Sequence, residues 1–175
     1  KAHIEVTTEK LLECAKCSKY EIVHTAERAL ENLVTSLDPL RCFQSLLPYL
    51  EISDENADDW AVPLLALRTL CKLVERVPAQ ALLDSLPSSL GPCLVTGMRH
   101  KAVDIRKASV FVVVEMHFVV GDGLLSRLDG LTAANAKLIS IYIERHPKSG
   151  KAAVADGEGG TTREPPVVVV QQNVS

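Results

Sequence analysis

The chain has 175 residues and a net charge of −3, and 47% of its residues are hydrophobic while 23% are charged. This composition is typical of a folded globular protein and excludes a wholly disordered chain. The small negative charge argues against a general nucleic-acid binder, because such proteins normally carry a strong basic excess. The chain begins at Lys1 without a methionine or a signal-like apolar segment, so we expect it to be a piece of a longer protein.

Apolar residues recur at helical spacing in the first half of the chain. They predict one helix over residues 20–37, a second over 40–50 and a third over 60–77. Asp38-Pro39 separates the first two helices, because proline fits the first turn of a helix but not its interior.

Polar residues and prolines interrupt this pattern. The stretch 53–59 is polar and acidic, which predicts a loop that ends in an N-cap candidate for the helix after it. Further on, three prolines divide the next segment into short helical pieces that end near Met98. These prolines are Pro78, Pro87 and Pro92.

The stretch 103–120 contains a run of β-branched residues directly after a charged lead-in. A membrane span is excluded, because Glu115 and His117 leave far fewer than the ~20 consecutive apolar residues that a bilayer requires. A central parallel strand is the alternative, but it needs alternating strands and glycine-rich turns, and the chain shows neither. A buried helix is the preferred interpretation. Its core stripe comprises Ile105, Ala108, Val112, Met116 and Val119.

These helices repeat along the chain. Val23-His24-Thr25-Ala26 aligns with Pro63-Leu64-Leu65-Ala66 after about 40 residues, and with Ile105-Arg106-Lys107-Ala108 after about 42 more. Such a period, with two antiparallel helices in each unit, is typical of HEAT and armadillo repeats. The sequence therefore predicts an all-α fold, an α-solenoid of about three to four helical hairpins in which the second helix of each unit is buried.

The end of the chain is predicted to be less regular. A short helix around 124–128 and a last helix ending near His146 complete the predicted domain, residues 1–146. From residue 147 onward glycine, proline and small residues predominate, so 147–175 is predicted to be a mostly flexible tail. The apolar run Val167–Val170 in this tail is interpreted as incidental rather than as a docking strand or linear motif.

The chain has five cysteines, an odd number, and several lie in apolar helical patterns where a reduced thiol behaves as a small hydrophobic side chain. This usage fits a reducing, cytosolic setting. Cys14-x-x-Cys17 is the one motif that suggests metal or redox chemistry, but a structural zinc site needs about four ligands and no second tight pair is present. A thioredoxin-like role would need a βαβ context that the chain lacks. The sequence therefore predicts no metal site.

Catalytic motifs are not found either. Gly157-Glu158-Gly159-Gly160 follows no predicted strand and opens no helix, so it is not a phosphate-binding loop. Asp58-Asp59 is interpreted as part of a solvated loop, and His100 and His117 have no evident nucleophile beside them. The sequence predicts a non-enzymatic protein without a cofactor.

The end of the folded part resembles the C-terminal domain of the CLASP family, the CLIP-associated microtubule proteins. The residues that carry this resemblance are Asp104-Ile105-Arg106-Lys107, Gly121-Asp122, Leu128, Leu131, Lys137-Leu138-Ile139, Ile141-Tyr142-Ile143 and Arg145. Upstream, the stretch from Glu13 to Glu21 and His24-Thr25-Ala26-Glu27 resemble plant and green-algal members in particular. The resemblance spans residues 9–146, and the acidic loop 53–59 and the tail depart from the family pattern.

The resemblance implies a TOG-like HEAT domain that acts as a docking module. Family members stabilise growing microtubules, while other TOG domains and a basic linker bind tubulin or the microtubule lattice. Their C-terminal domain recruits partners such as CLIPs, kinetochore components and membrane or cortical adaptors. The expected partners are therefore CLIP-like or other microtubule and cortical adaptors, with no nucleic acid and no direct membrane insertion. The expected location is the cytoplasm, at the microtubule cytoskeleton.

The alternative is direct capture of tubulin through the turns inside the repeats, as in TOG domains that grip tubulin. Two of these turns, near 17–19 and 99–101, are basic, whereas the stretch 51–59 carries five carboxylates. These carboxylates would repel acidic tubulin, which favours the docking of other partners. The candidate contacts for a partner or for tubulin are Lys16, Lys19, Trp60, Arg99 and Lys101.

Four residues of the 103–120 helix are expected to have structural roles. Asp104 suits the positive end of the helix dipole, and Arg106 is expected to reach the equivalent turn of a neighbouring repeat. Val112 and Met116 are expected in the core stripe of the helix.

Overall fold

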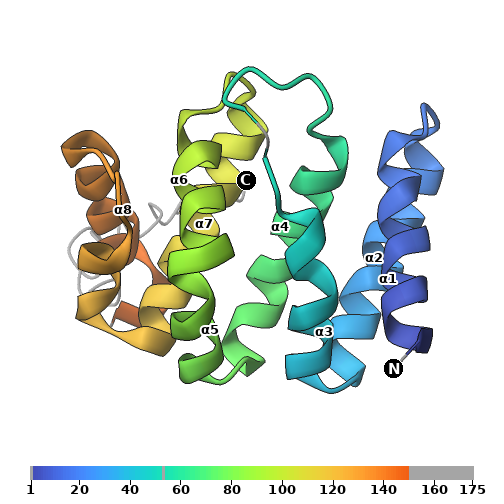
Figure 1. Ribbon diagram of the computed structural model, residues 1–175, viewed down its shortest axis with the longest axis horizontal. Coiled ribbons are helices and arrows are strands. Elements are labelled where there is room, and N and C mark those ends of the chain that lie inside the picture. The colour runs from blue at the N-terminus through green and yellow to red at the C-terminus, as the bar shows by residue number, and fades with distance from the viewer. Residues whose placement is uncertain (1, 53, 150–175) are drawn as a thin grey trace, which may run out of the picture.

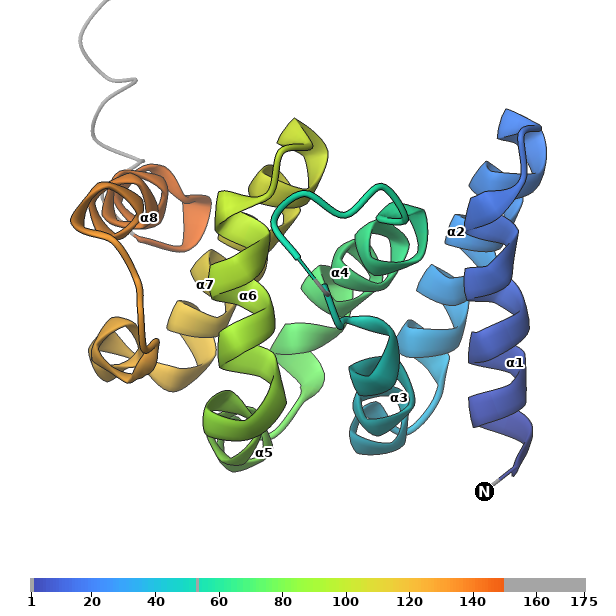
Figure 2. The same cartoon turned by 45° about the horizontal axis from the view of Figure 1, so that its top comes forward.

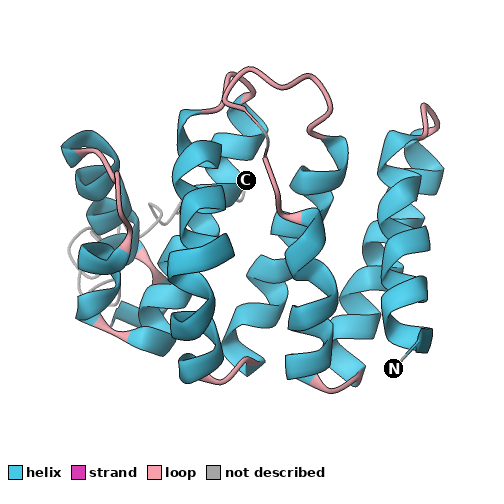
Figure 3. Ribbon diagram, in the orientation of Figure 1, coloured by secondary structure: helices cyan, strands magenta, loops and turns pink. Residues whose placement is uncertain are grey.

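A computed structural model describes residues 2–52 and 54–149, and within these ranges every regular element is helical (Figures 1 and 3). The α-helices are α1 (Ala2–Glu13), α2 (Tyr20–Ser36), α3 (Pro39–Leu46), α4 (Ala61–Leu73), α5 (Ala79–Ser85), α6 (Gly91–Arg99), α7 (Val103–Val120) and α8 (Ala133–Arg145). Short helical turns are η1 (Cys14–Lys16), η2 (Leu47–Tyr49), η3 (Val74–Arg76), η4 (Leu86–Leu90), η5 (Asp122–Arg127) and η6 (Pro147–Ser149). The predicted all-α fold is confirmed.

The helices form a solenoid that runs in chain order from α1 at one end to α8 at the other (Figures 1 and 2). Consecutive helices α1 and α2, α3 and α4, and α6 and α7 pack as hairpins, and α8 packs beside α7. The three helices that align in the sequence, α2, α4 and α7, also pack against one another in that order. Each is the second helix of its hairpin, so the predicted repeat register is confirmed.

Helix α7 is buried on several sides, as its sequence predicts. It packs against α4, α5, α6 and α8, and Ile105, Val112 and Met116 are fully buried. The valines on its flanks, Val110 and Val113, are buried as well. Tertiary packing thus overrides the β-propensity of the valine run. Neither α7 nor any other helix in the described residues is long and apolar enough to cross a bilayer.

An arginine joins two consecutive repeats. Arg76, in η3 directly after α4, donates from Nη1 to the carbonyl of Val34 and from Nη2 to the carbonyl of Leu37 at 3.1 Å. These carbonyls lie at the end of α2, where the helix itself supplies no further donors. Arg76 therefore fixes the position of α4 relative to α2.

The segment from α5 to α6 differs from its prediction. Instead of separate pieces, α5, the π turn η4 and α6 follow one another end to end. Pro87 and Pro92 lie at the start of η4 and of α6, so their missing N–H groups fall where one type of helical turn changes to the next. Gly91 permits the π turn, because a Cβ at this position would collide with the carbonyl oxygen of Leu86. The prolines thus change the type of helical turn without ending the helix.

Helix α1 is not predicted by the sequence pattern. Its buried side chains are Thr8 and Leu12, with Ile4 and Leu11 packed partly against the core. The Thr8 hydroxyl lies 3.2 Å from the Ser45 hydroxyl of α3. A threonine at a core position weakens the apolar periodicity, and this explains why the helix escapes prediction.

The last helix of the prediction corresponds to α8, and the short one around 124–128 is the 3-10 turn η5. Gly121 ends α7 with a φ of 93°, a left-handed conformation that favours glycine. Thr132 begins α8, because its hydroxyl accepts the Asn135 N–H at 3.2 Å.

Contacts with α7 continue at and beyond residue 146, the expected end of the domain. His146 Nε2 lies 3.0 Å from Glu115 Oε1, and Lys148 Nζ lies 2.7 Å from Glu115 Oε2 and also pairs with Glu75. Residues 150–175, and with them most of the predicted tail, lie outside the described residues, as do Gly157-Glu158-Gly159-Gly160 and Val167–Val170.

Candidate protein-docking surface

The basic turns and the acidic loop lie at one edge of the solenoid. The chain between α3 and α4 arches over to the turn between α6 and α7 (Figure 1). Two hydrogen bonds to its backbone attach the acidic loop, of which residues 54–59 are described. The Lys101 N–H donates to Glu55 O at 2.8 Å, and His100 Nε2 lies 3.1 Å from Ala57 O. The acidic loop of the second repeat is therefore bound to the turn of the third.

Two lysines among the candidate contacts pair with carboxylates of the acidic loop. Lys16 Nζ lies 2.9 Å from Asp59 Oδ2, and Lys101 Nζ lies 2.5 Å from Asp58 Oδ1. A hydrogen bond from Lys101 and its positive charge hold the pKa of Asp58 below its ordinary value of 3.8. Because both pairs are exposed to solvent, their main effect is on the charge of this edge rather than on stability.

Arg99 is held in a similar way. Its Nη1 lies 3.7 Å from Glu55 Oε1, and its Nη2 donates to the carbonyl of Gly130. The second contact joins the turn of the third repeat to the chain just before α8. Three of the five candidate contacts are thus already paired with carboxylates of their own chain.

His100 holds the acidic loop in place through a hydrogen bond from its buried side chain. Its side chain is fully buried, and its Nδ1 accepts the Ala102 N–H at 3.0 Å. The other ring nitrogen, Nε2, then carries the proton and donates to Ala57 O. The sequence shows only a histidine without a nucleophile beside it, because its partner lies in a different repeat. His100 has a structural role in holding the acidic loop.

Arg106 also supports this turn, but not as expected. Its Nη1 donates to the carbonyls of His100 and Lys101, each at 2.7 Å. It therefore binds the turn that precedes its own helix instead of the turn of a neighbouring repeat. The reason is its place only one turn into α7, from which the side chain reaches back. Asp104 is exposed in the first turn of α7, where a carboxylate faces the positive end of the helix dipole.

Lys19 and Trp60 stand apart from these ion pairs. Lys19 precedes α2 and is exposed, and within the described residues its side chain has no ion-pair partner. Trp60 is half-buried against the core and occupies the N-cap position of α4 without a side-chain cap bond. The expected N-cap role of the acidic loop is therefore not seen, since Asp58 and Asp59 bind lysines instead.

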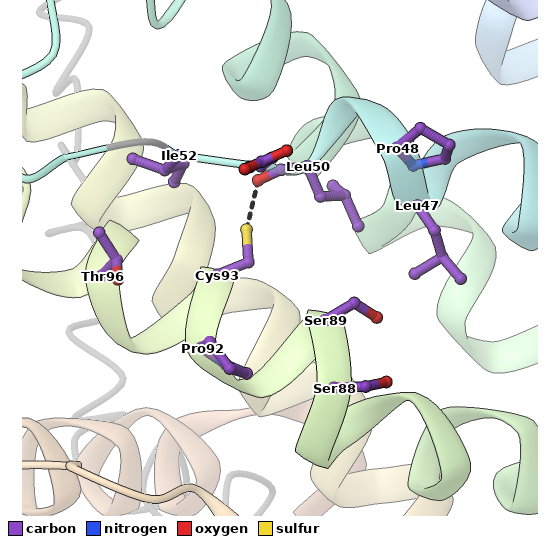
Figure 4. Close-up of a pocket in the computed structure, with 10 residues that line it drawn as sticks. Leu47, Pro48, Leu50, Ile52, Ser88, Ser89, Pro92, Cys93 and Thr96 are labelled. Carbon is purple, nitrogen blue, oxygen red and sulfur yellow. Dashed lines mark hydrogen bonds between the residues drawn. The ribbon is translucent and has the colours of Figure 1, made fainter.

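A cleft of about 490 Å³ opens beside the start of the loop, between η2 and α6 (Figure 4). Pro48, Ser89 and Thr96 are among the residues that line it. The Cys93 thiol points at the carbonyl of Leu50, and burial raises the pKa of this thiol to about 12. A thiol with so high a pKa stays protonated and unreactive. The cleft therefore offers hydroxyl groups but no reactive thiol.

Metal ligation finds no support in the described residues. No three side chains of His, Cys, Asp or Glu gather there closely enough to hold an ion. Cys14 Sγ donates to Lys10 O at 3.3 Å, and Cys17 is half-buried. That the protein binds no zinc stays a prediction.

No family model matches the chain. Curated relatives do: CLIP-associating protein 1-A of Xenopus laevis and CLIP-associating protein 1 of Xenopus tropicalis are each 34% identical over 145 residues. The CLIP-associated protein of Arabidopsis thaliana is 29% identical over 155 residues. These matches cover 83%, 83% and 89% of this chain.

The chain spans about 10% of the length of these relatives, so it corresponds to one segment of a much longer protein in each case. The matched relatives come from both animals and a plant and carry the same family name. The resemblance seen in individual residues is thereby confirmed. On this similarity, the chain belongs to the family of CLIP-associating proteins.

Proposed function

We propose that this chain is a non-enzymatic docking domain, residues 1–146, of a microtubule-associated protein. It binds CLIP-like or other microtubule and cortical adaptors, and so localises a microtubule-stabilising factor in the cytoplasm. The names of the matched relatives, CLIP-associating and CLIP-associated protein, support a CLIP-type partner. The helical repeat fold supports docking, because solenoids present extended surfaces to other proteins.

The observation that carries this proposal is the pairing of the basic turns with the acidic loop. Lys16, Arg99 and Lys101 would have to leave carboxylates of their own chain before they could contact acidic tubulin. Glu51 and Asp54, which form no ion pair among the described residues, would add repulsion. This edge is therefore poorly suited to tubulin, which favours an adaptor as the partner.

Binding of a purified CLIP-type protein tests the proposal. The two proteins are mixed at micromolar concentration and analysed by size-exclusion chromatography with light scattering. We expect a complex that survives in the Lys16→Glu/Lys101→Glu variant, because the docking surface is not the basic edge. No complex with the wild-type chain would refute a CLIP-type partner.

Direct tubulin capture remains the second candidate. It is favoured by the gathering of Lys16, Arg99 and Lys101 at one edge and by the exposure of their ion pairs, which salt and competing charges can break. Lys19 adds an exposed positive charge. In the same assay with tubulin, this candidate requires a complex that the Lys16→Glu/Lys101→Glu variant loses.

A further inference from the structure

A second surface lies between α7 and α8, where the two helices enclose a groove of about 290 Å³. Val103, Lys107 and Phe111 of α7 line one wall, and Asn135, Leu138 and Tyr142 of α8 line the other. These residues belong to the second helix of the third repeat and to the last helix of the solenoid.

Several large apolar side chains in this groove are exposed to solvent. The exposed fraction is 51% for Val103, 42% for Phe111, 40% for Leu138 and 39% for Tyr142. The rings of Phe111 and Tyr142 meet edge to face with their centroids 5.4 Å apart. Exposed apolar residues gathered in one place, unlike scattered ones, mark interaction sites.

The two charged residues that line the groove are both positive. Arg106 and Lys107 line it, and no acidic side chain does among the described residues. Neither cation forms an ion pair in the part of the chain that the structure describes. In a chain with a net charge of −3, this is a local basic region. An occupant that carries carboxylates beside its apolar residues would be attracted to it.

The spacing of the wall residues suits a helix. Val103, Lys107 and Phe111 follow one another at every fourth position of α7, and Asn135, Leu138 and Tyr142 at every third or fourth position of α8. Each row extends for about two helical turns, roughly 12 Å at most. A helix that presents anchors at every third or fourth residue fits between two such rows.

From these observations we infer that the groove between α7 and α8 binds an acidic amphipathic helix of a partner protein. Its apolar anchors contact Phe111, Leu138 and Tyr142, and its carboxylates face Lys107. This inference rests on the proposed docking function and adds to it the place and the chemistry of the contact.

Binding of a synthetic peptide to the full 175-residue chain tests this inference. The probe has about 20 residues, enough to be helical in isolation, with leucine at every third or fourth position and glutamate at most others. Fluorescence anisotropy measures its binding to the wild type, to Phe111→Ser and to Lys107→Glu. Matched controls are Tyr20→Ser, which removes another exposed aromatic ring, and Lys137→Glu, which reverses a charge in the second turn of α8 outside the groove. Thermal melts establish that every variant is folded.

We expect Phe111→Ser and Lys107→Glu each to weaken peptide binding about tenfold or more, the loss typical of an interface anchor. The two controls should bind as the wild type does, and a peptide with lysine in place of glutamate should not bind. Absence of binding, or equal losses in the control variants, would overturn the inference.

Two other occupants of the groove would also overturn this inference, and separate measurements distinguish them. A wild-type dimer in sedimentation that Phe111→Ser dissolves would identify a second copy of the chain. Tighter peptide binding by a Val168→Asp/Val169→Asp variant would identify the C-terminal residues of this chain as the occupant of the groove. The docking function itself does not depend on these results, because its assay uses an intact CLIP-type protein.

Discussion

His100 is the residue through which the acidic loop is attached to the third repeat. Replacement by alanine removes a fully buried ring and leaves Ala57 O and the Ala102 N–H without their partner. We expect His100→Ala to lower the free energy of unfolding by about 2 to 4 kcal/mol. Urea denaturation measures this. His24→Ala, at an exposed histidine, should change it by less than about 0.5 kcal/mol, and equal effects of the two variants would speak against the role of His100.

The titration of Asp58 reports whether Lys101 is paired with it in solution. Because the pKa of Asp58 is lowered, its pair contributes stability above the ordinary pKa of 3.8 and loses it as the pH falls through the folded-state value. Carbon NMR of the side-chain carboxyl group should show a midpoint below 3.8 in the wild type. In Lys101→Ala the midpoint should return toward 3.8. A wild-type midpoint at or above that value would show that the pair does not form.

Residue-level predictions from the sequence succeed for the core of α7 and are incomplete for the basic turns and the acidic loop. Val112 and Met116 could be assigned to the core because helical spacing alone marks a buried stripe. Lys16 and Lys101 could be identified as basic residues in turns. Their pairing with Asp59 and Asp58 could not be foreseen, since it depends on how the chain between α3 and α4 crosses to the next repeat.

At the scale of single elements, the π turn η4 explains how a proline-rich segment stays helical. Gly91 is essential to it, because a Cβ there would meet the backbone oxygen of Leu86, which cannot easily move. We expect Gly91→Ala to cost about 1 to 3 kcal/mol, as overpacking typically does. Gly123→Ala is the control, because no atom lies within 4 Å of its Cβ position. Urea denaturation that shows Gly91→Ala as stable as Gly123→Ala would contradict this account of the turn.

The elements themselves were predictable wherever apolar spacing was strong. Helix α7 matches its prediction, because its valines and Met116 define both a stripe and buried flanks. Helix α1 was missed because Thr8 occupies a core position. The continuity of α5 with α6 was missed because proline signals a break in sequence, and the compensating role of Gly91 appears only in three dimensions.

At the scale of the whole molecule, charge and shape point to different surfaces. The edge with the basic turns is neutralised by the acidic loop, whereas the groove between α7 and α8 keeps its positive charges and its exposed rings. A helical repeat protein can thus carry basic turns at one edge and still, as we propose here, bind its partner through a different surface. The family could be identified from the sequence, but the choice between these surfaces could not, because it depends on side chains of different repeats.

The central claim is that the carboxylates of the acidic loop, by pairing with the basic turns, prevent these turns from binding tubulin. The most direct measurement is co-elution with purified tubulin at micromolar concentration and low salt, for the wild type and for Glu55→Gln/Asp58→Asn/Asp59→Asn. We predict no complex with the wild type and a detectable complex with the loop variant, in which Lys16, Arg99 and Lys101 no longer face carboxylates of the loop. A wild-type complex with tubulin that Lys101→Glu abolishes would contradict the claim.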